Sequence, residues 1–254
     1  MDGDDQVAQL RAVAAAVGLA GAGLGAAFVV TLAAALVVGA LGVQLGVVVS
    51  VVLTLALTAG VAFGGVSVAY LAYRGRGPST VGLRWLSVPD LAWTGGGYLL
   101  ALGAALVVSL AVVAAGGEPA PNQLSQLGVE APALLLLLVP VSLLFIGPGE
   151  ELLFRGVVQG RLREAFGPAA AVLLSSAIFA GSHFLALVGS AGARLTTIAV
   201  LFFPALVLGA AYERTGNLVV PALIHGLYNA TLAVLLYVAL QFSGMGATAA
   251  LTPW

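Results

Sequence analysis

The chain has 254 residues, of which 61% are hydrophobic and 7% are charged, and its formal net charge is −1. Because an ordinary soluble domain carries roughly 25% charged residues, this composition excludes a water-soluble globular protein. The near-zero charge gives no sign of a nucleic-acid partner. The sequence contains no cysteine, which excludes a disulfide framework and cysteine-based catalysis.

Long apolar runs follow one another from the N-terminus. Residues 12–41 and 44–73 carry no charge, and each exceeds the roughly 20 apolar residues that cross a bilayer as a helix. Further runs, split at polar residues, glycine and proline, predict five more spans, over residues 91–115, 131–160, 168–189, 195–213 and 218–241. The runs are continuous rather than alternating, which disfavours a β-barrel. We therefore predict an all-α polytopic transmembrane helical bundle of about seven spans, with eight as the alternative count.

The distribution of arginine predicts the orientation of this bundle. Arginine-rich loops near span ends tend to stay on the cytoplasmic side. With seven spans and a cytoplasmic N-terminus, Arg194 lies outside, and seven arginines lie on the cytoplasmic side: Arg11, Arg74, Arg76, Arg84, Arg161, Arg163 and Arg214. The acidic start MDGDDQ lacks the basic region of a signal peptide, so we expect a retained first span. These features predict a multi-pass protein of the plasma membrane.

The first two spans are notable for glycine rather than for chemically active residues. Glycines four residues apart let membrane helices approach closely. Such pairs are Gly21/Gly25, Gly42/Gly46 and Gly60/Gly64. Residues 1–130 contain no diagnostic motif, and we expect them to form a scaffold of transmembrane helices.

The stretch GPGEELLFRG, residues 147–156, places three charges inside the fourth span. A charge at the bilayer centre costs about 2.5–3.5 kcal/mol on insertion scales, so such residues usually have a function. Glu151 and Arg155 are four residues apart, with the acid nearer the N-terminus, which favours an ion pair between them. Glu150 is then left without this partner. Pro148 predicts a kink, and Gly147 and Gly149 are expected to loosen the backbone beside it. A purely structural ion pair between helices is the alternative.

The two histidines lie in late spans. His183 follows Phe179 by four residues, and His225 precedes Asn229 by four, so that His225 and Asn229 share one helix face. At about 1.5 Å per residue, Glu150, both histidines and Asn229 reach similar depths in the bilayer. A carboxylate, two imidazoles and an amide in a small wet cavity form a plausible hydrolytic set.

Three motifs in these spans resemble those of a known family. The segments EELLFR (150–155), FAGSH (179–183) and HGLYN (225–229) resemble the EExxxR, FxxxH and HxxxN motifs of the CPBP intramembrane proteases. This group includes the type II CAAX prenyl endopeptidases and the Abi bacteriocin-immunity proteins. The resemblance covers about residues 140–232, and residues 131–245 are then expected to form the catalytic helical core.

The resemblance implies a membrane-embedded protease whose cavity, formed by the later helices, opens toward the cytoplasm. Glu150 would activate water, and His183 would position that water or shuttle its proton. His225 and Asn229 would stabilise the oxyanion. Glu151, Arg155 and Phe179 match the remaining motif positions and would support the site. The implied partners are the lipid bilayer and a membrane-protein or lipidated peptide substrate.

The role of zinc stays open in the sequence. Glu150, His183 and His225 could supply three ligands with a fourth position for water, as in catalytic zinc sites. There is no HExxH motif, however, and a ligating Glu150 could not also act freely as base, so we favour glutamate-activated water without obligatory Zn²⁺. Two other functions are considered: a proton-coupled transporter, and a non-catalytic immunity or assembly factor of the same family.

Overall fold

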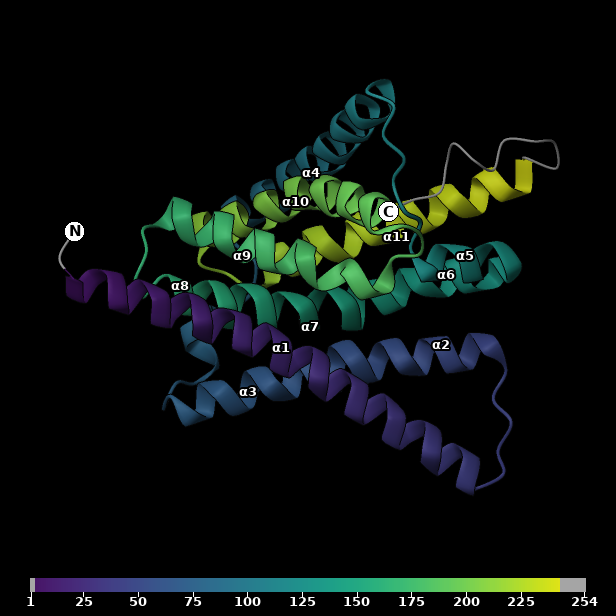
Figure 1. Ribbon diagram of the computed structural model, residues 1–254, viewed down its shortest axis with the longest axis horizontal. Helices are drawn as coiled ribbons and strands as arrows, with labels where there is room; N and C mark the ends of the chain where they lie inside the picture. The colour runs from purple at the N-terminus through teal and green to yellow at the C-terminus, as the bar shows by residue number, and fades with distance from the viewer. Residues whose placement is uncertain (1–2, 243–254) are drawn as a thin grey trace.

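The computed structural model describes residues 3–242 and shows a bundle of helices (Figure 1). Within this range, seven helices are long and apolar enough to cross a membrane: Gly3–Ala40, Val47–Tyr73, Val88–Ala114, Pro132–Leu162, Pro168–Ala186, Ala191–Thr215 and Val219–Phe242. The all-α prediction and the count of seven spans are therefore confirmed. Residues 243–245 of the expected catalytic core lie outside the described range.

Several of these spans are composite. The second consists of α2 (Val47–Leu55), the π-helical η1 (Ala56–Phe63) and α3 (Gly64–Tyr73). The fourth consists of α6 (Pro132–Val141), η3 (Ser142–Ile146), α7 (Gly147–Glu151), η4 (Leu152–Gln159) and α8 (Gly160–Leu162). The fifth consists of α9 (Pro168–Ser182) and the short 3₁₀ turn η5 (His183–Ala186). The others are single helices: α1 (Gly3–Ala40), α4 (Val88–Ala114), α10 (Ala191–Thr215) and α11 (Val219–Phe242).

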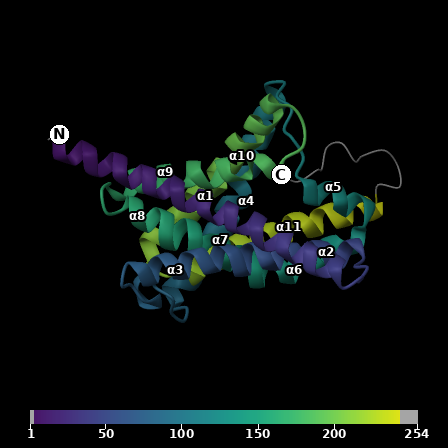
Figure 2. The ribbon, with the colours of Figure 1, turned by 60° about the horizontal axis from the view of Figure 1, so that its bottom comes forward.

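Helix α11 lies at the centre of the packing. It contacts α4, α10 and the composite fourth span, and ten of its residues are buried. Helix α10 packs against α4 and α9, and α1 crosses η1 and η4 on the other side (Figure 1). The short helix α5 (Gln123–Glu130) contacts α6 and α11, far from α8 along the bundle (Figure 2).

Helix α1 packs through a stripe of small residues, but not through the expected glycine pairs. Gly21 and Gly25 have no atom within 4 Å of a built Cβ, and Gly60 meets only the ring of Phe145. The buried face of α1 instead carries Ala12, Ala16, Ala20, Gly23 and Ala27. The prediction for Gly21/Gly25 is wrong because their helix face points away from neighbouring helices.

The glycines beside Pro148 also differ from expectation. A Cβ on Gly147 would meet the backbone of Ala222 on α11, and a Cβ on Gly149 would meet the carbonyl of Ala59 on η1. These glycines therefore let two helices approach opposite faces of α7, rather than simply loosening it. The irregularity expected at Pro148 takes the form of π-helical turns on both sides, η3 and η4.

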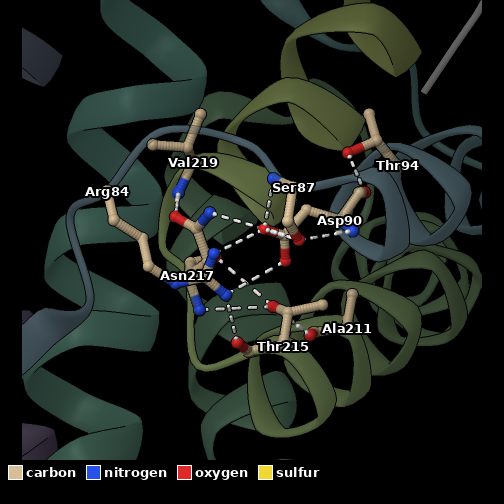
Figure 3. A network of polar contacts seen from close by, with 8 residues as sticks. All are labelled: Arg84, Ser87, Asp90, Thr94, Ala211, Thr215, Asn217 and Val219. Atoms are coloured by element: carbon tan, nitrogen blue, oxygen red, sulfur yellow. Dashed lines mark hydrogen bonds and ion pairs between the residues drawn. The ribbon is translucent and has the colours of Figure 1, made fainter.

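The first turn of α4 is joined to α10 and α11 by a buried carboxylate (Figure 3). Asp90 is 2% exposed and accepts hydrogen bonds from Arg84 Nη1 at 2.6 Å and from the Ser87 amide at 2.8 Å. Asn217, which caps α11 through the Val219 amide, donates to the same carboxylate at 3.3 Å. Three helix ends are thereby held together by one charged group.

Several arginines gather at this end of the bundle. Glu164, between α8 and α9, forms ion pairs with Arg74, Arg76 and Arg161 at 3.2, 2.7 and 2.8 Å. Burial alone would raise the pKa of Glu164, but the hydrogen bonds and charges of Arg74 and Arg76 hold it below its ordinary value. We call this end, formed by residues 74–90, 161–168 and 213–219, the arginine end. The opposite end, with α5 and the η5–α10 loop that includes Arg194, is the α5 end.

Candidate active site

Three side chains from three spans converge in the bundle. Glu150 lies on α7, His183 at the start of η5 and His225 on α11. Oε2 of Glu150 lies 4.0 Å from Nε2 of His183 and 4.0 Å from Nε2 of His225. This oxygen is shielded from solvent and has no hydrogen-bond partner among the described residues. The structure thus brings together three of the four residues predicted to act in catalysis.

The fourth predicted residue, Asn229, lines the same cavity one turn after His225. Both project from one face of α11, as their four-residue spacing predicted. The four residues therefore border one continuous space.

The orientation of His183 is set by its own helix. Nδ1 of His183 lies 2.9 Å from the carbonyl oxygen of Phe179, one turn earlier. Because a carbonyl can only accept, Nδ1 carries the proton, and in the neutral ring Nε2 is then an acceptor that faces Glu150. Two acceptors 4.0 Å apart leave a place for a molecule that can donate to both.

Glu151 links the fourth span to α11. Its Oε2 accepts from Nε of Arg155 at 3.0 Å, so the predicted ion pair is confirmed, and both side chains are completely buried. Its Oε1 lies 2.9 Å from Nδ1 of His225, a contact that the sequence did not predict. Glu151 therefore neutralises Arg155 and also orients His225.

A further set of buried polar residues supports Arg155. Nη1 of Arg155 lies 3.3 Å from Oγ of Ser175, which donates to Oε1 of Gln159 at 3.1 Å. Gln159 in turn donates to Glu213 at 3.1 Å. Sequence reasoning missed these residues, although Glu151, Arg155 and Gln159 repeat every four residues along one helix face.

Phe179 packs among the charged and imidazole groups. Its ring centroid lies 4.8 Å from that of His183 and 5.6 Å from that of His225, and the Arg155 guanidinium lies 5.2 Å from it. The ring is 4% exposed and forms a buried apolar surface beside both histidines and the Arg155 guanidinium.

The site opens into a cavity of about 740 Å³. Its walls come from both halves of the chain: α1 contributes Leu24 and Thr31, the second span contributes Ser50 and Thr54 on α2 and Thr58 on η1, and α5 contributes Gln123, Leu124 and Leu127. Residues 1–130, expected as scaffold, therefore also shape the site. Sequence reasoning missed them because single threonines in an apolar span form no motif.

Tyr228 also lines this cavity. Its ring packs between α4 and α10, and its hydroxyl is buried without a hydrogen-bond partner among the described residues.

The donor chemistry of Glu150, His183 and His225 suits zinc, but their arrangement is loose. Zinc holds nitrogen and oxygen ligands at about 2.0–2.2 Å. Among residues 3–242, no group of three or more His, Asp or Glu side chains lies close enough to hold a metal ion. The residues named as zinc ligands do not form a ligand set in this conformation.

Residues 132–231 match the family described as type II CAAX prenyl endopeptidase Rce1-like. No curated protein and no solved structure matched the chain. The matched segment contains all three motifs and the residues that converge at the site. The match over residues 132–231 supports the resemblance of this part of the chain to the CPBP/CAAX protease family of intramembrane proteases.

Proposed function

We propose that the protein is an endopeptidase that hydrolyses a peptide bond of a membrane-associated substrate with water activated by Glu150. One observation carries this proposal: Oε2 of Glu150, which has no hydrogen-bond partner within residues 3–242, faces Nε2 of His183 and of His225, each at 4.0 Å, beside a cavity of about 740 Å³. A carboxylate that is free of protein partners and close to two imidazoles is suited to act as a general base.

The proposed first step is attack by water on the scissile carbonyl carbon. A water that donates to Oε2 of Glu150 and to Nε2 of His183 has its oxygen lone pair free for attack. As the C–O bond forms, Glu150 accepts the proton and the carbonyl oxygen becomes an oxyanion. The C–N bond then breaks, and Glu150 returns the proton to the leaving amine.

The developing oxyanion is stabilised by Asn229 and His225 in this proposal. The Asn229 amide is a donor in every protonation state, whereas His225 donates from Nε2 when both ring nitrogens carry protons. Glu151 then balances the charge of the imidazolium at 2.9 Å. Arg155, with Ser175 and Gln159 behind it, holds Glu151 in place.

Zinc is not required for these steps. If the loose cluster tightened around Zn²⁺, then Glu150, His183 and His225 would hold it, and the metal would supply a Lewis acid for the water. The role of base would then have to pass to another group.

We further propose that the protein lies in the plasma membrane with its N-terminus and arginine end in the cytoplasm. The ion pairs that gather Arg74, Arg76 and Arg161 around Glu164 support a single basic end. The residues that line the cavity support a division of labour in which residues 1–130 shape the substrate space and residues 131–245 carry the chemistry.

The proposal is tested with Glu150→Gln in purified protein reconstituted in nanodiscs. A fluorogenic farnesylated CAAX peptide and a membrane-peptide library serve as substrates, and Asp4→Asn, an exposed acid at the start of α1, is the control. We expect cleavage by wild type and control and a loss of at least about 100-fold in the variant, because a general base contributes 10²–10⁴-fold. Full activity of Glu150→Gln removes it as the base. If neither wild type nor the variants cleave a peptide and the protein takes up ions into proteoliposomes, a transporter is favoured instead.

A further inference from the structure

Three hydroxyl groups on the cavity wall have no hydrogen-bond partner within residues 3–242. They belong to Thr54 of α2, Thr58 of η1 and Ser142 of η3, and all three residues line the cavity. A serine or threonine in a membrane helix can donate to the carbonyl oxygen one turn earlier. Thr31 and Ser50, which line the same cavity, do so at 2.7 and 3.1 Å. We call Thr54, Thr58 and Ser142 the hydroxyl wall, whose hydroxyls are left for a partner inside the cavity.

One end of the hydroxyl wall lies at the level of the proposed base. A Cβ on Gly149 would meet the carbonyl of Ala59, so the fourth and second spans touch at this point. Thr58 directly precedes Ala59, and Glu150 directly follows Gly149. Thr58 and Glu150 therefore border the cavity at the same level of the bundle.

The rest of the hydroxyl wall lies on one side of Glu150. The second and fourth spans run in the same direction, since α2 contacts α6, η1 contacts η3 and α3 contacts η4 (Figure 1). Thr54 lies five residues and Ser142 seven residues before the point where these spans touch, which is about 8 and 11 Å at 1.5 Å per residue. An extended peptide advances about 3.3 Å per residue, so the wall has the length of about three substrate residues.

Two features indicate that these hydroxyls have a function. Thr58 and Ser142 belong to π-helical segments, η1 and η3, which are rare and frequently lie at functional sites. Ser142 is also 2% exposed, and a buried hydroxyl without a partner costs free energy. A substrate bound in the cavity would supply the missing hydrogen bond.

We propose that Thr54, Thr58 and Ser142 bind the main chain of a substrate segment that lies extended beside Glu150. This inference rests on the proposed function and deepens it, because it names the conformation of the bound substrate and residues outside the three motifs that bind it. A helical segment satisfies its backbone groups internally and offers little to such a wall. An extended segment presents unpaired N–H and C=O groups along its edges.

The spacing of the hydroxyls suits an extended peptide. Thr54 and Thr58 are four residues apart, which is about 6 Å along the helix. Backbone groups on one edge of an extended peptide recur every two residues, or about 6.6 Å. Each hydroxyl can accept from an N–H or donate to a carbonyl. Other walls of the cavity are apolar and suit apolar side chains: they include Leu127, Leu135, Leu232 and Leu236.

The test measures binding rather than cleavage. Thr54→Val, Thr58→Val and Ser142→Ala are each placed in Glu150→Gln protein in nanodiscs, and the Kd of a fluorescent farnesylated CAAX peptide is measured. We expect each substitution to raise the Kd by about 2- to 10-fold, the value of one neutral hydrogen bond. The control is Thr196→Val, which removes a hydroxyl outside the cavity that bonds its own helix at 3.0 Å, and it should leave the Kd unchanged.

A second set of peptides separates direct contact from altered packing. In each peptide one backbone amide is replaced by an ester, which removes the N–H and weakens the carbonyl as an acceptor. We expect one ester to weaken binding to the Glu150→Gln parent but to have no further effect in Thr54→Val. For Thr58→Val, the ester without further effect should lie two residues nearer the scissile bond. A variant that only disturbed packing would leave the effect of every ester unchanged.

An unchanged Kd in all three variants overturns the proposal. Ester effects that add to those of the substitutions at every position also overturn it, and so does failure of every form to bind the peptide. None of these readouts requires turnover. Full cleavage by Glu150→Gln would therefore remove the proposed base while the binding result still stands.

Discussion

Nδ1 of His225 lies 2.9 Å from Oε1 of Glu151, so the histidine of the last span is bound to the second carboxylate of the EELLFR motif. The other oxygen of Glu151 accepts from Arg155 at 3.0 Å. One fully buried carboxylate thus holds together two helices that are more than 70 residues apart in the sequence. The tandem glutamates have different surroundings: each oxygen of Glu151 accepts from one donor, whereas Oε2 of Glu150 has no donor among the described residues.

Removal of Arg155 should be strongly destabilising. Arg155→Leu leaves Glu151 as an uncompensated buried charge, and breaking a buried pair in this way costs about 3–5 kcal/mol. The double variant Glu151→Leu/Arg155→Leu should lose less stability than the sum of the single variants, because neither charge remains. Thermal unfolding in nanodiscs measures all three, and additive losses would show that the pair is not coupled. Both single variants should also lose peptide cleavage, since His225 is no longer oriented.

The two glycines beside Pro148 provide a packing test. Gly149→Ala places a methyl group against the carbonyl of Ala59 and should destabilise by about 1–3 kcal/mol, as overpacking does. Gly21→Ala, where the added Cβ meets no atom within 4 Å, is the matched control and should be neutral or slightly stabilising. Unfolding temperatures in the same lipid compare the two. Equal stability of both variants would contradict the close approach of α7 to η1.

Two tyrosines of the α4–α11 interface should respond differently to loss of their hydroxyls. Tyr98 Oη lies 2.7 Å from Thr231, so Tyr98→Phe should cost about 1 kcal/mol, the typical net value of a hydrogen bond. Tyr228 has a buried hydroxyl without a partner in the described part of the chain, so Tyr228→Phe should be at least as stable as wild type. A large loss of stability in Tyr228→Phe would reveal a bound water or another partner for its hydroxyl.

The arginine end should lose stability at acid pH. Burial raises the pKa of Glu164, but the hydrogen bonds and charges of Arg74 and Arg76 hold it below its ordinary value in the folded protein. The contribution of ionised Glu164 to folding stability is therefore complete above its unfolded pKa of about 4.3. It is lost as the pH falls through the lower pKa of the folded protein. Hydrogen exchange of residues 161–168 between pH 7 and pH 3 measures this loss. Glu164→Gln should exchange faster at pH 7 and show a weaker dependence on pH.

Removal of metal should leave the reaction intact if water is activated by Glu150 alone. Wild-type protein depleted of metal by a chelator is expected to keep its rate of peptide cleavage, because no proposed step uses an ion. Metal content and turnover are determined on the same sample. A rate that falls on depletion and returns with Zn²⁺ would instead assign Glu150, His183 and His225 as ligands.

The sequence by itself determined the class of protein, the number of spans and most of the candidate site. Continuous apolar runs can only be stable in a bilayer as helices, so seven spans follow from composition. Charged and imidazole side chains are costly in the bilayer, so Glu150, Glu151, Arg155, His183 and His225 stood out against their surroundings. The four-residue spacing of Glu151 and Arg155 predicted their ion pair because both partners lie on one helix.

Only the tertiary structure decided what lies between helices. The contact of His225 with Glu151, the backbone contacts of Gly147 and Gly149, and the cavity wall formed by Ser50, Thr54 and Thr58 join segments far apart in the chain. The helical period fixes which residues share a face, but it does not fix which neighbour that face meets. For the same reason the position of the hydroxyl wall beside Glu150 could be read only from the packed bundle.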